Sequence, residues 1–148
     1  MGRIVRIFLL TAAVLASARA FADGRNFDIE HLPLATGGGD KVVRLWDMTT
    51  GKLRRSLEGQ RDWICTLAFS PDGKLIASGS CEWGSHRGHD WPRSPSLGEE
   101  QSEWRVSEVA TGKLRHAAAE SGRILSLAFA PNGQTLAFGV GKEVRLHE

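Results

Sequence analysis

The chain has 148 residues, 41% of them hydrophobic and 24% charged, with a formal net charge of +2. This balance is typical of about one globular domain and excludes a disordered low-complexity protein. No 20-residue apolar run and no long block of like charges is present, so neither an ordinary membrane span nor a charged tail is indicated.

The first 22 residues have the layout of a secretory signal peptide. Arg3 and Arg6 form a short basic start, residues 7–16 are apolar, and Ala20-Phe21-Ala22 fits a small-residue cleavage site. Ten apolar residues are too few to span a bilayer. We therefore expect export to the periplasm or beyond, with no membrane contact after cleavage. An amphipathic first helix, an uncleaved anchor and a cytoplasmic protein are the alternatives.

Cleavage also changes the charge. The first 22 residues hold three arginines and no acids, so the net charge falls from +2 to −1. A general nucleic-acid role loses its main support, because such proteins carry a basic surface.

Residues 23–33 are expected to be a linker or a poor first strand at 27–29, and a repeat follows over residues 34–148. LAFSPDGKLIASGS at 67–80 recurs as LAFAPNGQTLAFGV at 127–140, and TGKLRR at 50–55 recurs as TGKLRH at 111–116. The strand KVVRLWD at 41–47 returns as EVRLHE at 143–148, with a weaker copy, EWRVSEV, at 103–109.

The pieces between these repeats read as short antiparallel strands. Ser70-Pro71-Asp72-Gly73 and Ala130-Pro131-Asn132-Gly133 are turn sequences, because proline presets φ at the second position and glycine suits the fourth. Strands 64–69 and 124–130 are almost wholly apolar, which predicts cover on both faces, whereas 53–58 is polar like an outer edge. A unit graded from an apolar to a charged strand is typical of a propeller blade.

LAFSPDGKLIASGS, the V-R-L-W-D strand and T-G-K-L together resemble the WD40 repeat family, here a bacterial-type, exported member with truncated or degenerate repeats. The resemblance implies an all-β fold: a partial β-propeller of about 2.5–3 four-stranded antiparallel blades. It is expected to be open, because propellers close with about 4–8 blades. A fragment of a longer propeller, self-association that covers the exposed blade faces, and a decayed gene product without independent function are the explanations left open.

The resemblance also implies a buried hydrogen-bonded tetrad of His, Ser/Thr, Asp and Trp in each blade. Residues that fit the family motif are Thr36, Asp40, Trp46 and Asp47 in the first blade and Ser78 in the second. Other positions depart from it: Gln60 and Glu120 stand for His, Phe138 for Ser/Thr, and Ser107 and His147 for Trp. We expect these blades to be less stable than the family's average.

Residues 81–101 are an insertion between the second and third strands of the second blade. Cys81, His86, His89 and Asp90 suggest a zinc site, but structural zinc sites have two tight ligand pairs, which this stretch lacks. The sequence therefore predicts an irregular loop, and no metal or other cofactor.

The insertion shares one end of the blades with the connection at 58–63, because turns alternate ends in a meander. A partner-binding patch can form there from Arg61, Asp62, Trp63, Trp83 and Trp91, since tryptophan is common at binding hot spots. For Trp63, core packing is the stronger alternative. Cys65 and Cys81 can form a disulfide, which an exported protein permits.

No catalytic motif is found in the sequence. The resemblance therefore predicts a non-catalytic protein-interaction or scaffold module whose protein partner is unknown. A metal-binding protein that uses the insertion is the weaker alternative.

Overall fold

The computed structural model describes residues 14–15, 33–81 and 101–148. Within them the chain forms three antiparallel sheets and no helix long and apolar enough to cross a membrane. The strands are β1 (Val14–Leu15), β2 (Pro33–Thr36), β3 (Val43–Asp47), β4 (Leu53–Leu57), β5 (Ile64–Phe69), β6 (Leu75–Ser80), β7 (Gln101–Glu108), β8 (Leu114–Ser121), β9 (Ile124–Phe129), β10 (Leu136–Val140) and β11 (Glu143–His147).

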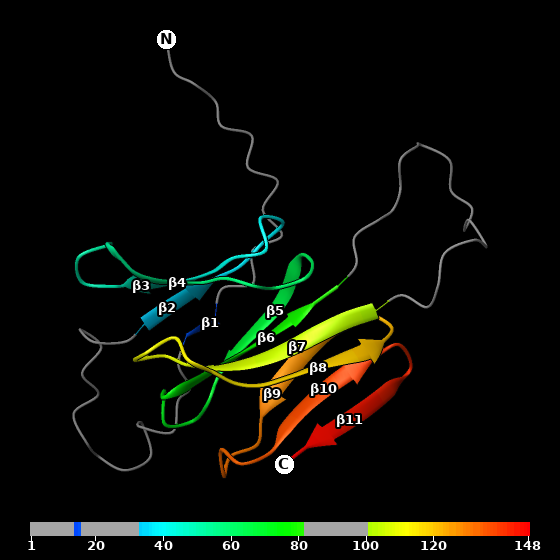
Figure 1. The fold of residues 1–148 in the computed structure, drawn as a ribbon. Coiled ribbons are helices and arrows are strands. Elements are labelled where there is room, and N and C mark those ends of the chain that lie inside the picture. The colour runs from blue at the N-terminus through cyan, green and yellow to red at the C-terminus, as the bar shows by residue number, and fades with distance from the viewer. Residues whose placement is uncertain (1–13, 16–32, 82–100) are drawn as a thin grey trace, which may run out of the picture.

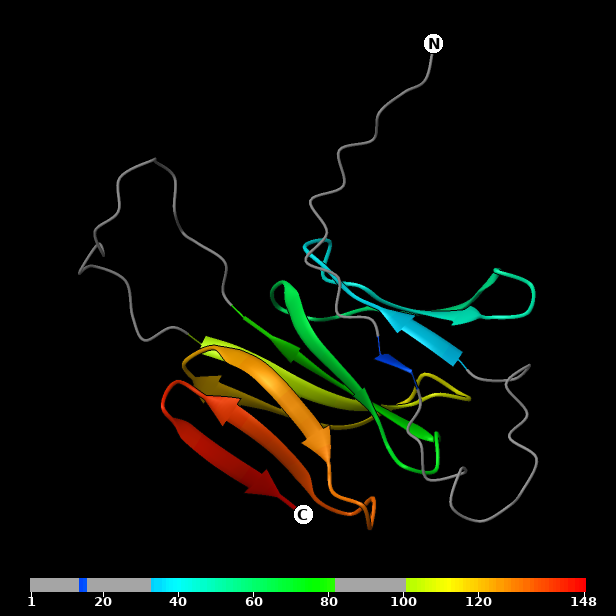
Figure 2. The ribbon, with the colours of Figure 1, turned by 180° about the vertical axis from the view of Figure 1, so that it is seen from behind.

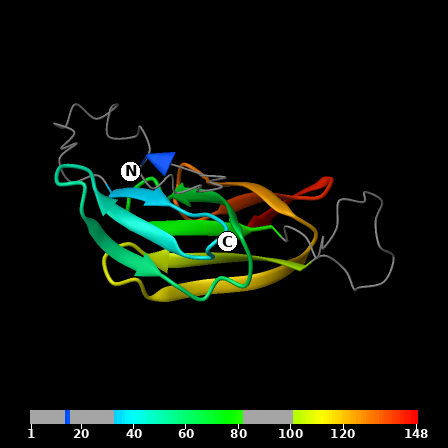
Figure 3. The same ribbon diagram turned by 90° about the horizontal axis from the view of Figure 1, so that it is seen from above.

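Each sheet is one blade, with its strands paired in chain order. Blade 1 is β1–β4, blade 2 is β5–β8 and blade 3 is β9–β11. The blades follow one another across the molecule, and β5 and β9, the first strands of blades 2 and 3, contact each other (Figures 1 and 2). Figure 3 shows the same three sheets from above. The predicted partial, open propeller is therefore confirmed.

The turns form where the repeated sequence predicts them. Gly73 and Gly133 each donate a backbone hydrogen bond, 2.9 Å long, to the residue three positions earlier, Ser70 and Ala130. In the T-G-K turns, Gly51 and Gly112 have φ values of 66° and 77°, a region that favours glycine because it has no Cβ.

Two hydrophobic cores lie between the blades. The core between blades 1 and 2 contains Ala35, Val43, Leu45, Ile64, Leu67, Phe69 and Ile76. The core between blades 2 and 3 contains Ala68, Ala77, Trp104, Val106, Ile124, Leu127, Leu136, Phe138 and Val140. Blade 2 is thus buried on both faces, as the nearly continuous apolar character of its first strand predicts.

The prediction that strand 124–130 is covered on both faces is wrong for one of them. Ile124 and Leu127 are buried, but Leu125, Ser126 and Ala128 are exposed. The strand repeats the sequence of β5, whereas blade 3 has a neighbouring blade on one side only within the described residues. The apolar sequence of a first strand therefore does not show whether one or two neighbouring blades cover it.

β1 was not predicted from the sequence. Val14 pairs with Ala35 and Leu15 with Leu34, so β1 is the first strand of blade 1. These two residues lie in the apolar segment for which the sequence predicts a signal peptide. The alternative first strand at residues 27–29 falls outside the described residues.

Candidate functional site

Trp46 in β3 forms the hydrogen bond that the resemblance implies for blade 1. Its indole Nε1 donates to Oγ1 of Thr36 in β2, at 2.8 Å. The pair is positioned by the β2–β3 register, in which Thr36 is opposite Arg44 and Leu34 is opposite Trp46. Both side chains are half-buried.

The two aspartates of the motif lie at opposite ends of β3. Asp40 is exposed and binds the backbone amide of Val42 at 3.3 Å and the guanidinium of Arg44. Asp47 accepts hydrogen bonds from the amide and hydroxyl of Thr50, at 2.9 and 3.0 Å, which hold the T-G-K turn. These bonds from Thr50 lower the pKa of Asp47, with a smaller contribution from Arg54.

In blade 2, Gln60 stands where the motif has His and still reaches Ser78. Gln60 is buried and donates a hydrogen bond from Nε2 to the Ser78 hydroxyl. Its other amide atom, Oε1, is buried and has no hydrogen-bond partner among the described residues. The replacement therefore keeps one bond of the network and leaves one acceptor unsatisfied, which is costly in a core.

The replacements in blade 3 build a different contact. Glu120 accepts a hydrogen bond from the Trp104 indole at 3.4 Å and forms an ion pair with Arg145. The His147 ring, at the Trp position, lies 4.6 Å from the ring of Trp104. Glu120 and His147 therefore tie blade 2 to blade 3 instead of closing a network within one blade.

The predicted patch at 58–63 is only partly described. Arg61 is exposed, and its carbonyl accepts a hydrogen bond from Nζ of Lys41 at 2.9 Å. Asp62 accepts a bond from the Trp63 amide at 2.7 Å. Trp63 is half-buried over Gly39, where an added Cβ would meet its ring at 3.2 Å. Trp63 therefore packs against Gly39, and Trp83 and Trp91 lie outside the described residues.

A disulfide joins Cys65 in β5 to Cys81 at the end of β6, with their Cα atoms 5.9 Å apart. It fixes the start of the insertion, and the amide of Cys81 also donates to the Trp63 carbonyl at 3.0 Å. Because Cys81 is bonded to Cys65, it has no thiolate to offer a metal. The remaining members of the suggested zinc set, His86, His89 and Asp90, lie outside the described residues.

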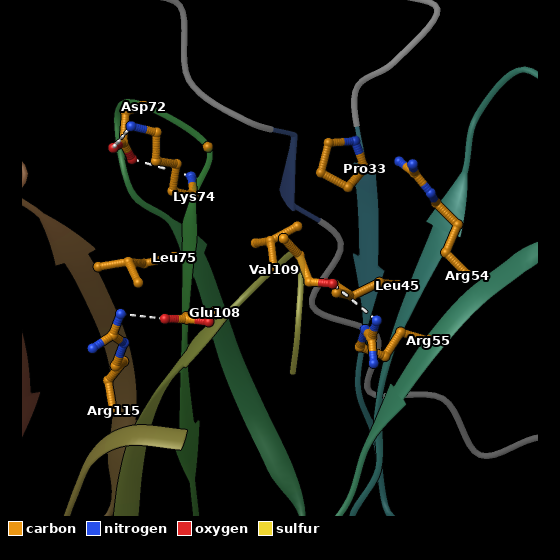
Figure 4. A pocket seen from close by; sticks show the side chains of 12 residues that line it. Pro33, Leu45, Arg54, Arg55, Asp72, Lys74, Leu75, Glu108, Val109 and Arg115 are labelled. Atoms are coloured by element: carbon orange, nitrogen blue, oxygen red, sulfur yellow. Dashed lines mark hydrogen bonds and ion pairs between the residues drawn. The ribbon is translucent and has the colours of Figure 1, made fainter. Parts of the chain in front are cut away.

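A cavity of about 690 Å³ opens between blades 1 and 2 (Figure 4). The blade 2 turns that line it lie at the opposite end of the sheet from the predicted patch at 58–63, because turns alternate ends in an antiparallel sheet with strands in chain order. Blade 1 contributes residues of β2, β3 and β4, and blade 2 contributes its β5–β6 and β7–β8 turns with the strand ends beside them. Apolar and charged side chains both line it: Pro33, Leu45, Leu75 and Val109, and Arg54, Arg55, Lys74, Arg115, Asp72 and Glu108.

Four basic groups and two acidic groups line this cavity, so its charge is positive. Lys74 lies 3.8 Å from Asp72, and Arg115 forms an ion pair with Glu108. Hydrogen bonds from the hydroxyls of Ser70 and Thr111 are the largest causes that lower the pKa values of Asp72 and Glu108. Both acids are therefore ionised at neutral pH and already neutralise Lys74 and Arg115.

The remaining basic groups are the arginines of β4. Arg55 donates to the carbonyl of Ala110 in blade 2 at 2.9 Å, which bridges the two blades. Among the described residues, the one ion pair of Arg54 is a long contact of 4.0 Å with Asp47, and half of its side chain is exposed. Arg54 thus keeps most of its charge available at the rim of the cavity.

This cavity was not predicted from the sequence, although one signal was present. Basic residues follow each T-G-K-L segment, as Arg54-Arg55 and as Arg115, and the turns that carry them lie at the same end of adjacent blades. Within residues 14–15, 33–81 and 101–148, no group of three or more His, Cys, Asp and Glu side chains is placed to hold a metal ion.

Comparison with known proteins gives two matches to one family model, described as "WD domain, G-beta repeat", at residues 11–47 and 51–89, just over half of the chain. The first match begins before β1 and ends with β3.

The chain is similar to parts of longer curated proteins. It is 45% identical over 64 residues to Coronin-7 of Mus musculus, covering 43% of this chain and 7% of that protein. It is 45% identical over 45 residues to Nuclear distribution protein PAC1 of Mycosarcoma maydis, covering 30% and 10%. For Small ribosomal subunit protein RACK1y of Oryza sativa, the identity is 44% over 46 residues, covering 31% and 14%. The matched parts thus span only a small share of these relatives.

Among solved structures, the β-propeller domain of Cps50 (Swd1) from Myceliophteria thermophila matches with a TM-score of 0.60 at 20% sequence identity. The match covers 77% of this chain and 30% of that one. This similarity shows the propeller fold.

Proposed function

Because this chain belongs to the WD40 repeat family, we propose that it is a non-catalytic protein-interaction module that binds a partner protein at the cavity between blades 1 and 2. The observation that carries the proposal is the cavity's composition. Pro33, Leu45 and Val109 form an apolar lining, and Arg54 stands at the rim with its charge largely available.

This composition fits an extended protein segment that places an apolar side chain inside and an acidic side chain at the rim. Ligand sites in proteins combine an apolar lining with a few placed polar groups that fix orientation. A carboxylate beside Arg54 completes a bidentate ion pair, the geometry that a guanidinium favours. The side chains of the cavity provide binding and no evident nucleophile, so a scaffold role suits them better than catalysis.

Fluorescence anisotropy can test this with a labelled peptide in which leucine is flanked by aspartates and glutamates. We expect saturable binding to the chain, weakening with salt, and much weaker binding of a peptide in which lysines replace the acids. Arg54→Glu should abolish binding of the acidic peptide. Arg61→Glu is the matched control, because it makes the same charge change on an exposed residue at the opposite end.

The two variants also decide between the two ends of the molecule. The end that carries Arg61, Asp62 and Trp63 is the second candidate, favoured by the disulfide that fixes the start of the insertion beside Trp63. Loss of binding in Arg61→Glu alone would move the binding site to that end. Equal binding of acidic and basic peptides by all three proteins would refute an interaction site at the cavity.

We also propose that the protein is exported. The disulfide supports this, because disulfides persist in oxidising compartments and are rare in the cytosol. The pairing of β1 with β2 counts against removal of residues 1–22. Mass spectrometry of the N-terminus after cell fractionation distinguishes a chain cut after Ala22 from an intact one. An intact chain in the cytosolic fraction would contradict export.

A further inference from the structure

Every blade has two faces, and the repeats show which residues of each face meet a neighbour. We call the face toward the following blade the leading face, and the face toward the preceding blade the trailing face. Blade 1 meets blade 2 through its leading-face residues Ala35, Gly37, Val43 and Leu45. Blade 2 meets blade 3 through the equivalent residues Ala77, Gly79, Trp104 and Val106, together with Thr66 and Ala68.

A glycine at the end of the second strand is the centre of each contact: Gly37 directly follows β2, and Gly79 lies in β6. A Cβ built on Gly37 would lie 2.6 Å from Cγ2 of Ile64, the first residue of β5. A Cβ built on Gly79 would lie 2.7 Å from Cγ2 of Ile124, the first residue of β9. The absence of a side chain at each glycine therefore makes room for the first isoleucine of the next blade.

Blade 3 carries the same leading face without a neighbour among the described residues. The equivalents of the blade 2 residues, assigned through the strand registers, are Ser126, Ala128, Ala137, Gly139, Val144 and Leu146. Val144 and Leu146 are 76% and 70% exposed, whereas Trp104 and Val106 are buried. A Cβ on Gly139 would meet only Oγ of Ser126, in its own blade. The room for an isoleucine is therefore open.

The trailing face of blade 1 is the matching surface, and no other blade covers it within the part of the chain that the structure describes. Leu34, Thr36 and Trp46 lie there at the positions of Ile76, Ser78 and Ser107 in blade 2. The three blade 2 residues are buried by the blade before them, with exposed fractions of 2%, 5% and 8%. The three blade 1 residues are only half-buried. One molecule thus carries both halves of the contact that joins its own blades, one at each end.

From these two faces we infer that two copies of this chain assemble head to tail, with the leading face of blade 3 in each copy against the trailing face of blade 1 in the other. A head-to-tail contact between two different faces forms a closed ring when the rotations between successive copies add up to a full turn. Two copies of the blades that the structure describes supply six, within the roughly 4–8 at which propellers close, whereas three copies supply nine. The second copy is therefore the partner that continues the existing stack and closes it. This inference does not depend on the peptide site at the cavity.

Light scattering on the purified, oxidised full chain tests the assembly directly. We expect twice the monomer mass over a wide range of concentrations, without larger species. The double variant Val144→Lys, Leu146→Lys should be monomeric with an unchanged β-sheet circular dichroism spectrum, because both side chains are exposed. Leu114→Lys is the matched control, since Leu114 is an exposed leucine on the outer strand β8 and should leave the dimer intact.

A mixing experiment tests the head-to-tail arrangement. Leu34→Lys impairs only the trailing face, so that variant and the double lysine variant should each be monomeric alone. When the two are mixed, the Leu34→Lys variant supplies an intact leading face and the double lysine variant supplies an intact trailing face. A heterodimer should therefore form through that one contact. If the double variant loses its β-sheet spectrum, Ala128→Lys probes the same face from β9, where Ala128 is exposed.

Three results would overturn the inference. A wild-type chain that is monomeric throughout would show that a second copy does not cover these faces. A dimer that persists in the double variant Val144→Lys, Leu146→Lys and also in the single variant Ala128→Lys would place the contact elsewhere. An assembly that grows with concentration beyond two copies would contradict a closed ring.

Discussion

The indole of Trp46 and the hydroxyl of Thr36 are joined by a 2.8 Å hydrogen bond across the β2–β3 pair. This bond holds together the two central strands of blade 1 beside an open face. Its geometry depends on a Trp and a Thr, residues that blades 2 and 3 replace at one or both of these positions. Blade 1 therefore depends on this pair more than the other blades depend on any equivalent one.

We predict that Trp46→Ala lowers the free energy of unfolding by about 2 kcal/mol or more, since it removes both a hydrogen bond and aromatic packing. Thr36→Val keeps the shape of the side chain and should cost only about 1 kcal/mol. Urea unfolding followed by tryptophan fluorescence and circular dichroism measures both. An equal loss from Trp91→Ala, in the insertion, would contradict the special role of Trp46.

Gln60 provides the second prediction. Gln60→Leu leaves the Ser78 hydroxyl without its donor in a buried site and should cost about 1–3 kcal/mol. Gln60→His restores the residue that the family motif has there and removes the unsatisfied Oε1, so it should match or exceed the wild-type stability. Denaturant midpoints of the three proteins give the comparison. A His variant as unstable as the Leu variant would mean that the Ser78 contact is not the source of the effect.

The third prediction concerns the glycines of the blade contacts. Gly79→Ala places a Cβ 2.7 Å from Ile124 and should cost about 1–3 kcal/mol, as overpacking of a core does. Gly139→Ala makes the same change at the equivalent position, where only the rotatable Ser126 hydroxyl is near. Its effect on monomer unfolding should be small. Thermal unfolding of both variants in the Val144→Lys, Leu146→Lys background separates folding from self-association.

The disulfide provides the fourth prediction. Cys65 and Cys81 are 16 positions apart, and a cross-link over about 15 residues is expected to add about 3 kcal/mol through the unfolded chain. Reduction, or Cys65→Ser with Cys81→Ser, should lower the melting temperature by a similar amount in each case. Addition of a reductant to the double serine variant is the control and should change nothing. Identical melting of oxidised and reduced wild-type protein would show that the bond does not stabilise the fold.

The fifth prediction is a pH dependence at one turn. The Ser70 hydroxyl is the largest of the contacts that lower the pKa of Asp72, so folding favours the ionised carboxyl. The stabilisation from the ionised Asp72 carboxyl is fully present above the pKa that this group has in the unfolded chain, near 3.8. It is lost as the pH falls through the lower pKa that the group has in the folded protein. Ser70→Ala should therefore reduce the loss of stability between neutral pH and pH values below the unfolded pKa. Urea midpoints across this range measure the difference.

Blade 3 supplies the control for this experiment, because its turn has Ala130 and Asn132 in place of Ser70 and Asp72. Ala130→Ser restores the hydroxyl beside a side chain that does not titrate, so the pH dependence should stay as in the wild type. A shift of similar size in both variants would assign the effect to the turn backbone and not to Asp72.

Much of the fold could be predicted because it repeats. Turn sequences and short apolar runs recur at fixed spacing, so β2 to β11 and their pairing follow from local chemistry. β1 could not be predicted in this way, because two apolar residues far from β2 in sequence carry no turn signal. The exposure of β9 was missed for another reason: the cover of a strand depends on a neighbouring blade and not on the strand's own residues.

The site was less predictable than the fold. Thr36 and Trp46 follow from the motif, since the strand register places them together. The cavity between blades 1 and 2 depends on how side chains from two blades meet, and single-blade patterns do not contain that information. The disulfide could not be decided from the sequence, because Cys81 follows the last residue of the regular β5–β6 pairing and its side-chain direction is not set by that pairing.

Val14 and Leu15 complete the hydrogen bonding of β2 and lie inside a segment with the features of an export signal. The same residues cannot be discarded by a peptidase and remain in the sheet of one molecule. A chain that retains them has an occupied β2 edge, whereas a processed chain offers that edge as a row of unpaired amides and carbonyls to any extended strand. Proteolytic maturation would therefore change the molecule's capacity for backbone pairing and not only its location.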